Sequence, residues 1–408
     1  MYKYIDLFAG CGGLSDGFEQ TRSYEGVAHV EWDKKAALTL TNRLKKKWKV
    51  EEAEKKVITF DIQRVNELIN GGSDPILGNC VGLKYNLGKS KKVDLLIGGP
   101  PCQAYSIAGR IRDVHGMKDD YRNFLFESYV EVMNWARPDI FVFENVQGIL
   151  SASPGGIPIV ERIHSAFSEA GYTTLDNFKD ALFNLEDYGI PQKRSRVIII
   201  GLNNKSFKSK EKALRILNDF YVDFKKTNKV TKKMTAGDAL SGLPEFHPIE
   251  SHHKNWSKKN SHSPEKSEFL NNTPRFHSKR DIEIFKLLAK DIELATNKYT
   301  SIEALKNLYT EKTGKKSSVH KYHVIRKNLP SNTIPAHLYK DGLRHIHWDS
   351  NQARTLTVRE AARLQTFDDD FEFFGSMGDQ YKMIGNAVPP LFAFLLAKSL
   401  LKLLELRN

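Results

Sequence analysis

The chain has 408 residues, of which 40% are hydrophobic and 11% aromatic, a composition that excludes a disordered chain and indicates a globular protein. The length allows two domains with separate cores. The net charge is +13, and only three cysteines are present, which excludes a disulfide framework and favours a reducing compartment. The first residues show no basic stretch followed by an apolar one, so we expect no secretory signal and a cytoplasmic protein.

Short runs rich in Val, Ile and Phe alternate with charged, helix-competent stretches such as 124–136 over the first 200 residues. We predict strands at 3–9, 26–32, 57–62, 93–101, 139–146 and 196–202. Apolar strands that alternate with helices are typical of a mostly parallel sheet covered on both faces. The sequence therefore predicts an α/β fold with a doubly wound, mostly parallel sheet.

The positive charge is concentrated in residues 203–330, which contain 27 Lys and Arg but 14 Asp and Glu, so this excess equals the net charge of the whole chain. A basic segment beside a neutral one is typical of a nucleic-acid-binding module. A lysine-rich, solvated insert is the alternative. Within the segment, apolar residues at helical spacing predict a helix over 280–295.

The compact pattern returns near residue 350. Thr357 and Glu360 form the sequence pattern of a capping box, and Pro389 and Pro390 mark the start of a last helix. This apolar tail is interrupted by lysines, so we expect a core helix and no membrane span. The predicted domains are a first domain of residues 1–202 plus 351–408 and a smaller basic domain inserted over residues 203–350.

A glycine-rich turn follows the first predicted strand in "IDLFAGCGGLSDGF", residues 5–18. Such a turn lets a ligand approach the backbone at a helix N-terminus, and Glu31 ends the second strand, where a carboxylate can hold ribose hydroxyls. Gly10 and Gly12 fit the dinucleotide spacing, but Ser15 stands in the third glycine position. The pattern favours a nucleoside cofactor such as S-adenosylmethionine, and a tight turn without a ligand is the alternative.

Two further residues at strand ends suit a nucleoside. Trp32 can stack on an adenine, although an aromatic residue at a strand end is more often part of the core. Asp61 can accept a hydrogen bond from the adenine amino group, although an aspartate there is as often a turn or cap residue.

One cysteine follows two prolines in "GGPPCQAYS", residues 98–106. Ligands bind at the carboxyl ends of the strands in doubly wound sheets, so Cys102 should lie beside the glycine turn. Glu144 ends the fifth predicted strand, and Arg194 and Arg196 precede the sixth. Thiol, carboxylate and guanidinium at one edge suit a nucleophile, a proton donor and an anion holder. Singly, they also suit a buried cysteine, a capping glutamate and surface arginines.

These motifs resemble those of the DNA (cytosine-5)-methyltransferases of bacterial restriction-modification systems, over most of the chain outside 203–330. The matching strings are "DLFAGCGGLSDGF", "EW", "DI", "GGPPCQAYS", "ENV", "QKRSR", "RTLTVREAARLQTF" and "GNAVPP". Tyr105 stands where the family usually has Phe. The resemblance implies the S-adenosylmethionine-dependent methyltransferase fold. It also implies that Cys102 is the nucleophile, that Glu144 contacts N3 of cytosine, and that Arg196, with Arg194 nearby, contacts O2.

The resemblance further implies an S-adenosyl-L-methionine pocket lined by Phe8, Gly10, Gly12, Glu31, Trp32, Asp61, Ile62 and Asn386. The implied substrate is double-stranded DNA, and the chemistry requires the target cytosine to be flipped out of the duplex. Residues 106–122 are polar and follow the nucleophile, so we hypothesise that they close over the DNA, with an ordinary exposed loop as the alternative. We expect a monomer, since a modification enzyme can treat each DNA strand separately. We expect no metal ion, because the histidines have no cysteine partners at zinc-like spacing. A cognate restriction endonuclease is a possible partner.

Other functions stay open. A tRNA cytosine methyltransferase of the same family shares this chemistry, but its Cys-Phe-Thr element is not found here. A non-catalytic DNA-binding relative is disfavoured by the intact Cys102, Glu144 and Arg196. An NAD-dependent oxidoreductase is disfavoured by the glycine spacing and by "PPCQ".

Overall fold

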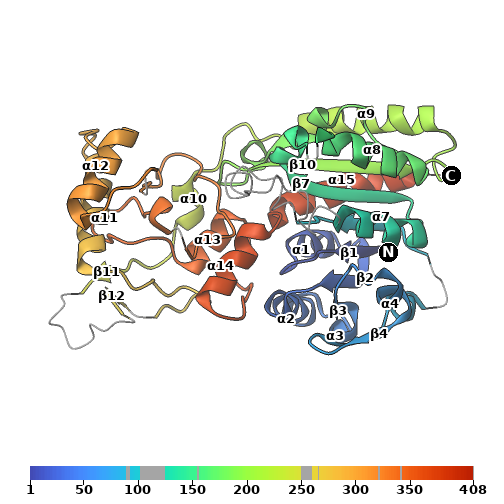
Figure 1. Ribbon diagram of the computed structural model, residues 1–408, viewed down its shortest axis with the longest axis horizontal. Helices are drawn as coiled ribbons and strands as arrows, with labels where there is room; N and C mark the ends of the chain where they lie inside the picture. Colours follow the sequence, from blue (N-terminus) through green and yellow to red (C-terminus); the bar gives the residue numbers. More distant parts are fainter. Residues whose placement is uncertain are drawn as a thin grey trace. The chain divides into compact units, whose positions relative to one another are not determined.

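The computed structural model describes residues 1–88, 92–101, 125–153, 156–249, 260–264, 266–319, 322–340 and 342–407, and these form two compact units (Figure 1). Unit 1 consists of Met1–Tyr188, Arg194–Thr231 and Ala387–Asn408, and unit 2 of Gly189–Lys193 and Lys232–Asn386. Cys102 and the predicted closing loop 106–122 lie outside the described residues.

Unit 1 is built on an eight-stranded mixed sheet with the order β3-β2-β1-β6-β7-β10-β8, and β9 pairs with β10. The strands are β1 (Tyr2–Leu7), β2 (Tyr24–Glu31), β3 (Val57–Thr59), β6 (Leu95–Gly98), β7 (Ile140–Val146), β8 (Tyr172–Thr173), β9 (Leu182–Asn184) and β10 (Ser195–Asn203). The first five are parallel, and β10 is antiparallel to β7, β8 and β9. The predicted mostly parallel α/β sheet and its six strand runs are confirmed.

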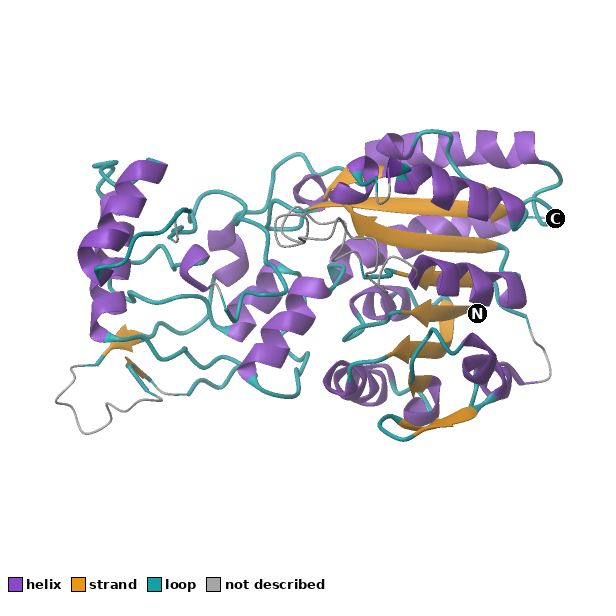
Figure 2. Ribbon diagram, in the orientation of Figure 1, coloured by secondary structure: helices purple, strands orange, loops and turns teal. Residues whose placement is uncertain are grey.

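Helices pack along the sheet of unit 1 (Figure 2). They are α1 (Gly13–Gln20), α2 (Lys34–Arg43), α3 (Ala53–Lys56), α4 (Val65–Asn70), α5 (Leu83–Leu87), α7 (Leu125–Ala136), α8 (Ile159–Glu169), α9 (Lys210–Thr227) and α15 (Pro390–Glu405). Shorter elements are η1 (Leu44–Trp48), η4 (Gln147–Ser151), η6 (Phe178–Ala181), η7 (Leu185–Tyr188) and the hairpin β4 (Gly72–Asp74) with β5 (Gly78–Cys80). Tyr129 of α7 and Phe167 of α8 pack on Phe143 of β7, with ring centroids 5.3 and 5.6 Å from it.

The last helix is a core helix, as the sequence predicts. It begins at Pro390 and packs on α1 so closely that a Cβ on Gly17 would lie 2.5 Å from that of Ala393. Among the described residues, 377–405 is the one stretch that by length and composition is apolar enough to cross a membrane, but 56% of its apolar window is buried within the protein. Burial of this kind is typical of a helix at the centre of a globular domain.

Unit 2 contains α10 (Ala236–Leu240), α11 (Lys279–Glu293), α12 (Ile302–Thr313), η8 (Gly342–Arg344), α13 (Val358–Leu364) and α14 (Met377–Asn386), and its two described strands β11 (His247–Pro248) and β12 (His262–Ser263) pair antiparallel. The predicted helix over 280–295 is confirmed as α11. Its apolar stripe contributes Ile284, Phe285 and Leu288 to a core that also contains Leu308 of α12 and Ile346. This core is separate from the sheet of unit 1.

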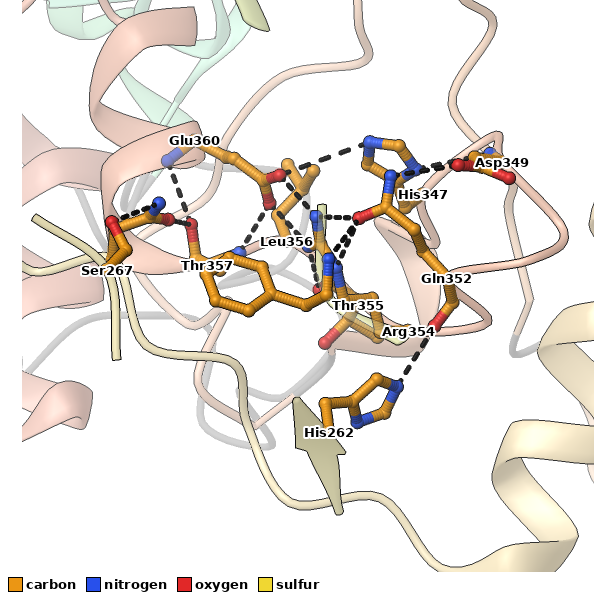
Figure 3. A network of polar contacts seen from close by, with 12 residues as sticks. His262, Ser267, His347, Asp349, Gln352, Arg354, Thr355, Leu356, Thr357 and Glu360 are labelled. Carbon is orange, nitrogen blue, oxygen red and sulfur yellow. Dashed lines mark hydrogen bonds and ion pairs between the residues drawn. The ribbon is translucent and has the colours of Figure 1, made fainter. Parts of the chain in front are cut away.

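A buried ion pair stabilises the start of α13 (Figure 3). Nη1 and Nη2 of Arg354 donate to the two carboxylate oxygens of Glu360 at 2.7 and 2.6 Å, and both side chains are almost completely buried. The predicted capping box is confirmed, since Thr357 Oγ1 accepts from the Glu360 N–H and Glu360 accepts from the Thr357 N–H. Three N–H donors on one carboxylate make a well-satisfied buried charge.

The limits of the two units differ from the predicted domain limits of 203–350. Helix α9, at 210–227, packs in unit 1, where Tyr221 donates a 2.6 Å hydrogen bond to the carbonyl of Ile198. Residues 351–386 belong to unit 2, because α13 packs with α10 and α14. The sequence around α9 is polar, so the prediction missed the stripe of buried residues by which this helix packs on the sheet of unit 1.

Candidate active site

Four parallel strands of unit 1 end at the same edge of the sheet. Leu7 of β1 lies opposite Val30 of β2 and Gly98 of β6, and Gly98 lies opposite Phe143 of β7. The next residue of each strand therefore reaches this edge, and these residues are Phe8, Glu31, Gly99 and Glu144. The register thus brings together the glycine turn, the ribose carboxylate and the catalytic glutamate that the sequence predicts.

The turn after β1 is tight and rich in glycine. Phe8 has a φ of 59°, Gly10 of 58° and Gly12 of 94°, so the chain reverses through left-handed backbone before α1. A Cβ on Gly10 would meet open space, whereas one on Gly12 would lie 2.4 Å from Cδ1 of Leu40. Gly12 is therefore required for packing, and Gly10 leaves backbone open at a helix N-terminus, where anionic and polar groups bind well.

Glu31 is held beside this turn. One carboxylate oxygen accepts from the N–H of Gly10 and the other from the N–H of Asp33, both at 2.7 Å. Burial raises the pKa of the Glu31 carboxyl, and these two N–H groups oppose that effect. A carboxylate can accept about four hydrogen bonds, so Glu31 keeps capacity to accept from a ribose hydroxyl. The residues fit a nucleoside cofactor.

The remaining predicted cofactor residues lie in different settings. Trp32 is 53% exposed, which argues against a core role and leaves its ring face available for stacking. Asp61 accepts from the N–H of Gln63 at 3.0 Å, so it also serves as a turn residue, and Ile62 is buried. Asn386 ends α14 in unit 2 and is exposed. Their contacts with a cofactor stay a prediction.

Glu144 and Arg196 form an ion pair at the edge. Nε of Arg196 lies 2.6 Å from Oε1 of Glu144, and the side chains are 12% and 11% exposed. The antiparallel register causes the contact, because β7 and β10 place Glu144 opposite Ile198, two residues from Arg196. Residues at this diagonal lie on the same face of a sheet, within reach of long side chains. The predicted proximity of carboxylate and guanidinium is therefore present.

Arg194 is buried, with 2% exposure, and its Nη2 donates to the carbonyl of Ala387 at 3.0 Å. Burial lowers the pKa of the Arg194 guanidinium, and the charge of Arg196 adds to the effect. The side chain thus links the start of β10 to the residue that opens the last segment of unit 1. A catalytic role of Arg194 stays a prediction.

Two residues that the sequence analysis left unassigned shape the segment before Cys102. A Cβ on Gly99 would lie 2.5 Å from Oε2 of Glu144, so any larger residue there would displace the carboxylate. Nδ2 of Asn145 approaches the carbonyl of Pro100 at 3.4 Å. Both residues stand within the quoted strings "GGPPCQAYS" and "ENV", which is the signal that could have identified them.

Among the described residues, no group of three His, Cys, Asp or Glu side chains is arranged to hold a metal ion. The parallel sheet, the glycine turn with its acidic partner and the Glu144–Arg196 pair at one edge define a Rossmann-like methyltransferase fold. Residues 2–402 match the model of a protein family described as "C-5 cytosine-specific DNA methylase". The chain belongs to that family and is a DNA (cytosine-5)-methyltransferase.

Named relatives cover nearly the whole chain. Type II methyltransferase M.Bpa9945I of Bacillus paralicheniformis is 32% identical, with 97% of each chain covered. Type II methyltransferase M1.HphI of Haemophilus parahaemolyticus is 28% identical over 98% of this chain and 87% of its own.

Two solved structures share the fold. A candidate DNA modification methyltransferase encoded within a prophage (E. coli) superposes with a TM-score of 0.62 at 23% identity, over 99% of this chain and 100% of its own. The Dnmt2 methyltransferase of S. pombe superposes with a TM-score of 0.56 at 14% identity, over 99% of each chain.

Proposed function

We propose that this enzyme transfers a methyl group from S-adenosyl-L-methionine to C5 of a flipped-out cytosine in a specific short sequence of double-stranded DNA. The observation that carries the proposal is the Glu144–Arg196 ion pair, at the same sheet edge as Glu31 and the glycine turn. Cys102 follows Gly99 by three residues, and Gly99 passes beside Glu144.

The residues of this edge suit the chemistry. Addition of the Cys102 thiolate to C6 of cytosine removes the aromaticity of the ring and makes C5 a nucleophile. The charge that develops on N3 and O2 needs a hydrogen-bonded carboxyl group and a cation, and Glu144 and Arg196 are proposed for these roles. The cofactor, when bound, supplies an electrophilic methyl group. A base then takes the C5 proton, and the C6–S bond breaks to release the Cys102 thiolate.

The cofactor pocket is proposed on the turn of residues 8–12, with Glu31 at the ribose and Trp32, Asp61 and Ile62 around the adenine. Support comes from the open space at Gly10, the two fixed N–H partners of Glu31 and the exposure of Trp32. Asn386 is proposed as a further contact.

We assign DNA recognition to the basic segment 203–350, which holds most of unit 2. Lysines would bind phosphates, while arginines, asparagines and histidines would contact base edges. We further propose a cytoplasmic monomer that modifies host DNA and protects it from a partner endonuclease. Loop 106–122, which follows Cys102, is proposed to close over the DNA.

The test is a methyl-transfer assay with purified protein and S-adenosylmethionine labelled in its methyl group, given bacterial genomic DNA or bulk tRNA. Mass spectrometry of the digested nucleosides should find labelled 5-methyl-2′-deoxycytidine from the DNA and no label in the tRNA. Label in 5-methylcytidine of tRNA alone would contradict the DNA substrate. Absence of label from both would contradict the catalytic role.

A further inference from the structure

Three fully buried polar side chains connect β1, α1 and β2 in unit 1. Asp6, Ser15 and His29 each have 0% exposure. Ser15 Oγ lies 2.6 Å from Oδ2 of Asp6 and 2.8 Å from Nδ1 of His29. Within the part of the chain that the structure describes, Oδ1 of Asp6 and Nε2 of His29 have no hydrogen-bond partner. A buried cluster with two unsatisfied atoms is costly for stability, so it calls for an explanation.

The cluster lies at both ends of the glycine turn. Asp6 precedes Phe8 by two residues, and Ser15 is in the first turn of α1. Ser15 is also the residue that replaces the third glycine of the dinucleotide pattern. Where a dinucleotide site would use a glycine for close packing, this chain places a hydroxyl that joins the end of β1 to the start of α1.

Only one hydroxyl proton is available for two neighbours, and this couples their protonation. With Asp6 ionised, Ser15 donates to Asp6, and Nδ1–H of His29 donates to Ser15. With Asp6 protonated, the carboxyl donates to Ser15, Ser15 donates to Nδ1, and the imidazole proton moves to Nε2. Uptake of one proton by the cluster therefore reverses both hydrogen bonds and exchanges the tautomer of His29.

The surrounding charges decide where that proton goes. Burial raises the pKa of Asp6 to about 7, and the charge of Glu31 adds to this. Burial lowers the pKa of His29 to about 3, and Lys56 adds to this, so the imidazole stays neutral. The other titratable groups facing Asp6 are Tyr4 on its own strand, which donates to Glu19 of α1 at 3.0 Å, and Tyr129 of α7. Among the described residues, Asp6 has no cationic partner.

We propose that Asp6, Ser15 and His29 form one proton-sharing cluster that positions the turn of residues 8–12 and favours a cationic cofactor over its neutral product. The cofactor assignment rests on the proposed function. S-adenosylmethionine carries a sulfonium charge, whereas the sulfur of S-adenosylhomocysteine is neutral. A cation bound at the turn stabilises ionised Asp6, and by linkage ionised Asp6 stabilises the cation. These three are positioning residues, since none of them is required to touch the cofactor.

The first test measures the affinities of S-adenosylmethionine and S-adenosylhomocysteine by calorimetry between pH 5.5 and 8.5. For the wild-type protein, the preference for the cation should rise severalfold as the pH rises through about 7. For Asp6→Asn, the ratio of the two affinities should lack this additional rise. Comparison of the variant with the wild type cancels the effect of the ligands' own titration. Equal pH slopes for the two proteins would overturn the proposal.

The second test needs no cofactor and no activity. Nitrogen NMR of histidine-labelled protein should show that the His29 proton moves from Nδ1 to Nε2 as the pH falls through about 7. Ser15→Ala removes the connecting hydroxyl and should abolish this coupled exchange. This variant also tests the cluster if the Asp6→Asn protein does not fold. A single His29 tautomer across the range would overturn the cluster. Failure of both ligands to bind at every pH would instead contradict the proposed function, and the cofactor preference with it.

Discussion

Nε of Arg196 lies 2.6 Å from Oε1 of Glu144, and the pair is largely withdrawn from water at the edge where the parallel strands end. The contact joins two strands that run in opposite directions. Removal of one partner from a buried ion pair is strongly destabilising, because it leaves the other charge buried without compensation. The contact with Arg196 fixes the position of Glu144, which suits its proposed role at the flipped base.

Glu144→Gln should reduce the rate of methyl transfer by about 10²–10⁴-fold, because the amide keeps the shape but cannot supply a proton. Cofactor affinity should change little, since Glu31 and the glycine turn are left intact. Single-turnover kinetics and calorimetry on the same preparation separate the two effects. A tenfold loss of cofactor affinity with a normal single-turnover rate would contradict the assignment.

Glu31→Gln should weaken cofactor binding by about 10- to 100-fold, which corresponds to loss of roughly 1.5–3 kcal/mol from hydrogen bonds to a charged group. The proposed ribose contacts make Glu31 responsible for binding. Calorimetric titration with S-adenosylhomocysteine measures the effect. Glu25→Gln on the same strand is the matched control, because Glu25 lies at the other end of β2 and pairs with Lys56 at 3.2 Å. Equal affinities for the two variants would contradict the role.

Glu360→Gln should lower the free energy of unfolding of unit 2 by about 3–5 kcal/mol, because the guanidinium of Arg354 would remain buried without its charged partner. Urea denaturation at pH 7 measures this loss. The double variant Arg354→Met with Glu360→Leu should lose less, since no buried charge remains. If the double variant is as unstable as the single one, the ion pair is not the cause (Figure 3).

The stability of unit 2 should fall in mild acid. Burial lowers the pKa of His347 to about 3 and that of His262 to about 4, well below the value of about 6.5 in an unfolded chain. Between the folded-state and unfolded-state pKa values of each histidine, the unfolded protein binds more protons than the folded protein. The neutral histidines therefore stabilise the fold fully above pH 6.5, and this stabilisation is lost as the pH falls. For each histidine, the free energy of unfolding should fall by up to about 2 kcal/mol between pH 6.5 and pH 5.

Urea midpoints at pH 7 and pH 5 test this pH dependence. Asp6 acts in the opposite direction in unit 1, because a raised carboxyl pKa favours the folded state as the pH falls from 7 towards 4. His347→Gln isolates the histidine effect and should have a smaller loss between the two pH values than the wild type. An unchanged loss would show that His347 does not titrate on unfolding.

The sequence predicts the sheet well because its six main strands lie in apolar runs rich in Val, Ile and Phe, and even the three-residue strand β3 is part of such a run. Strands β8 and β9 and the hairpin of β4 and β5 escape prediction, since each has only two or three residues. The direction of β10 also escapes, because a strand buried on both faces has the same apolar pattern whether it runs parallel or antiparallel.

The positions of Glu31 and Glu144 were predictable, because each carboxylate stands at the end of a predicted strand. The rest depends on register and packing. The contact of Arg196 with Glu144 requires the pairing of β7 with β10, and the cluster of Asp6, Ser15 and His29 requires three elements to meet. Ser15 was visible in the sequence only as a departure from a glycine pattern, and the structure supplies the reason for its hydroxyl.

The most direct test is bisulfite sequencing of DNA from a methylation-deficient bacterial host that expresses this chain, beside a host that expresses Cys102→Ser. The account predicts protected cytosines confined to one short sequence motif with the wild-type protein and none with the variant. Equal protection in both hosts would contradict Cys102 as the nucleophile. No protection in either, with soluble protein present, would contradict DNA cytosine as the substrate.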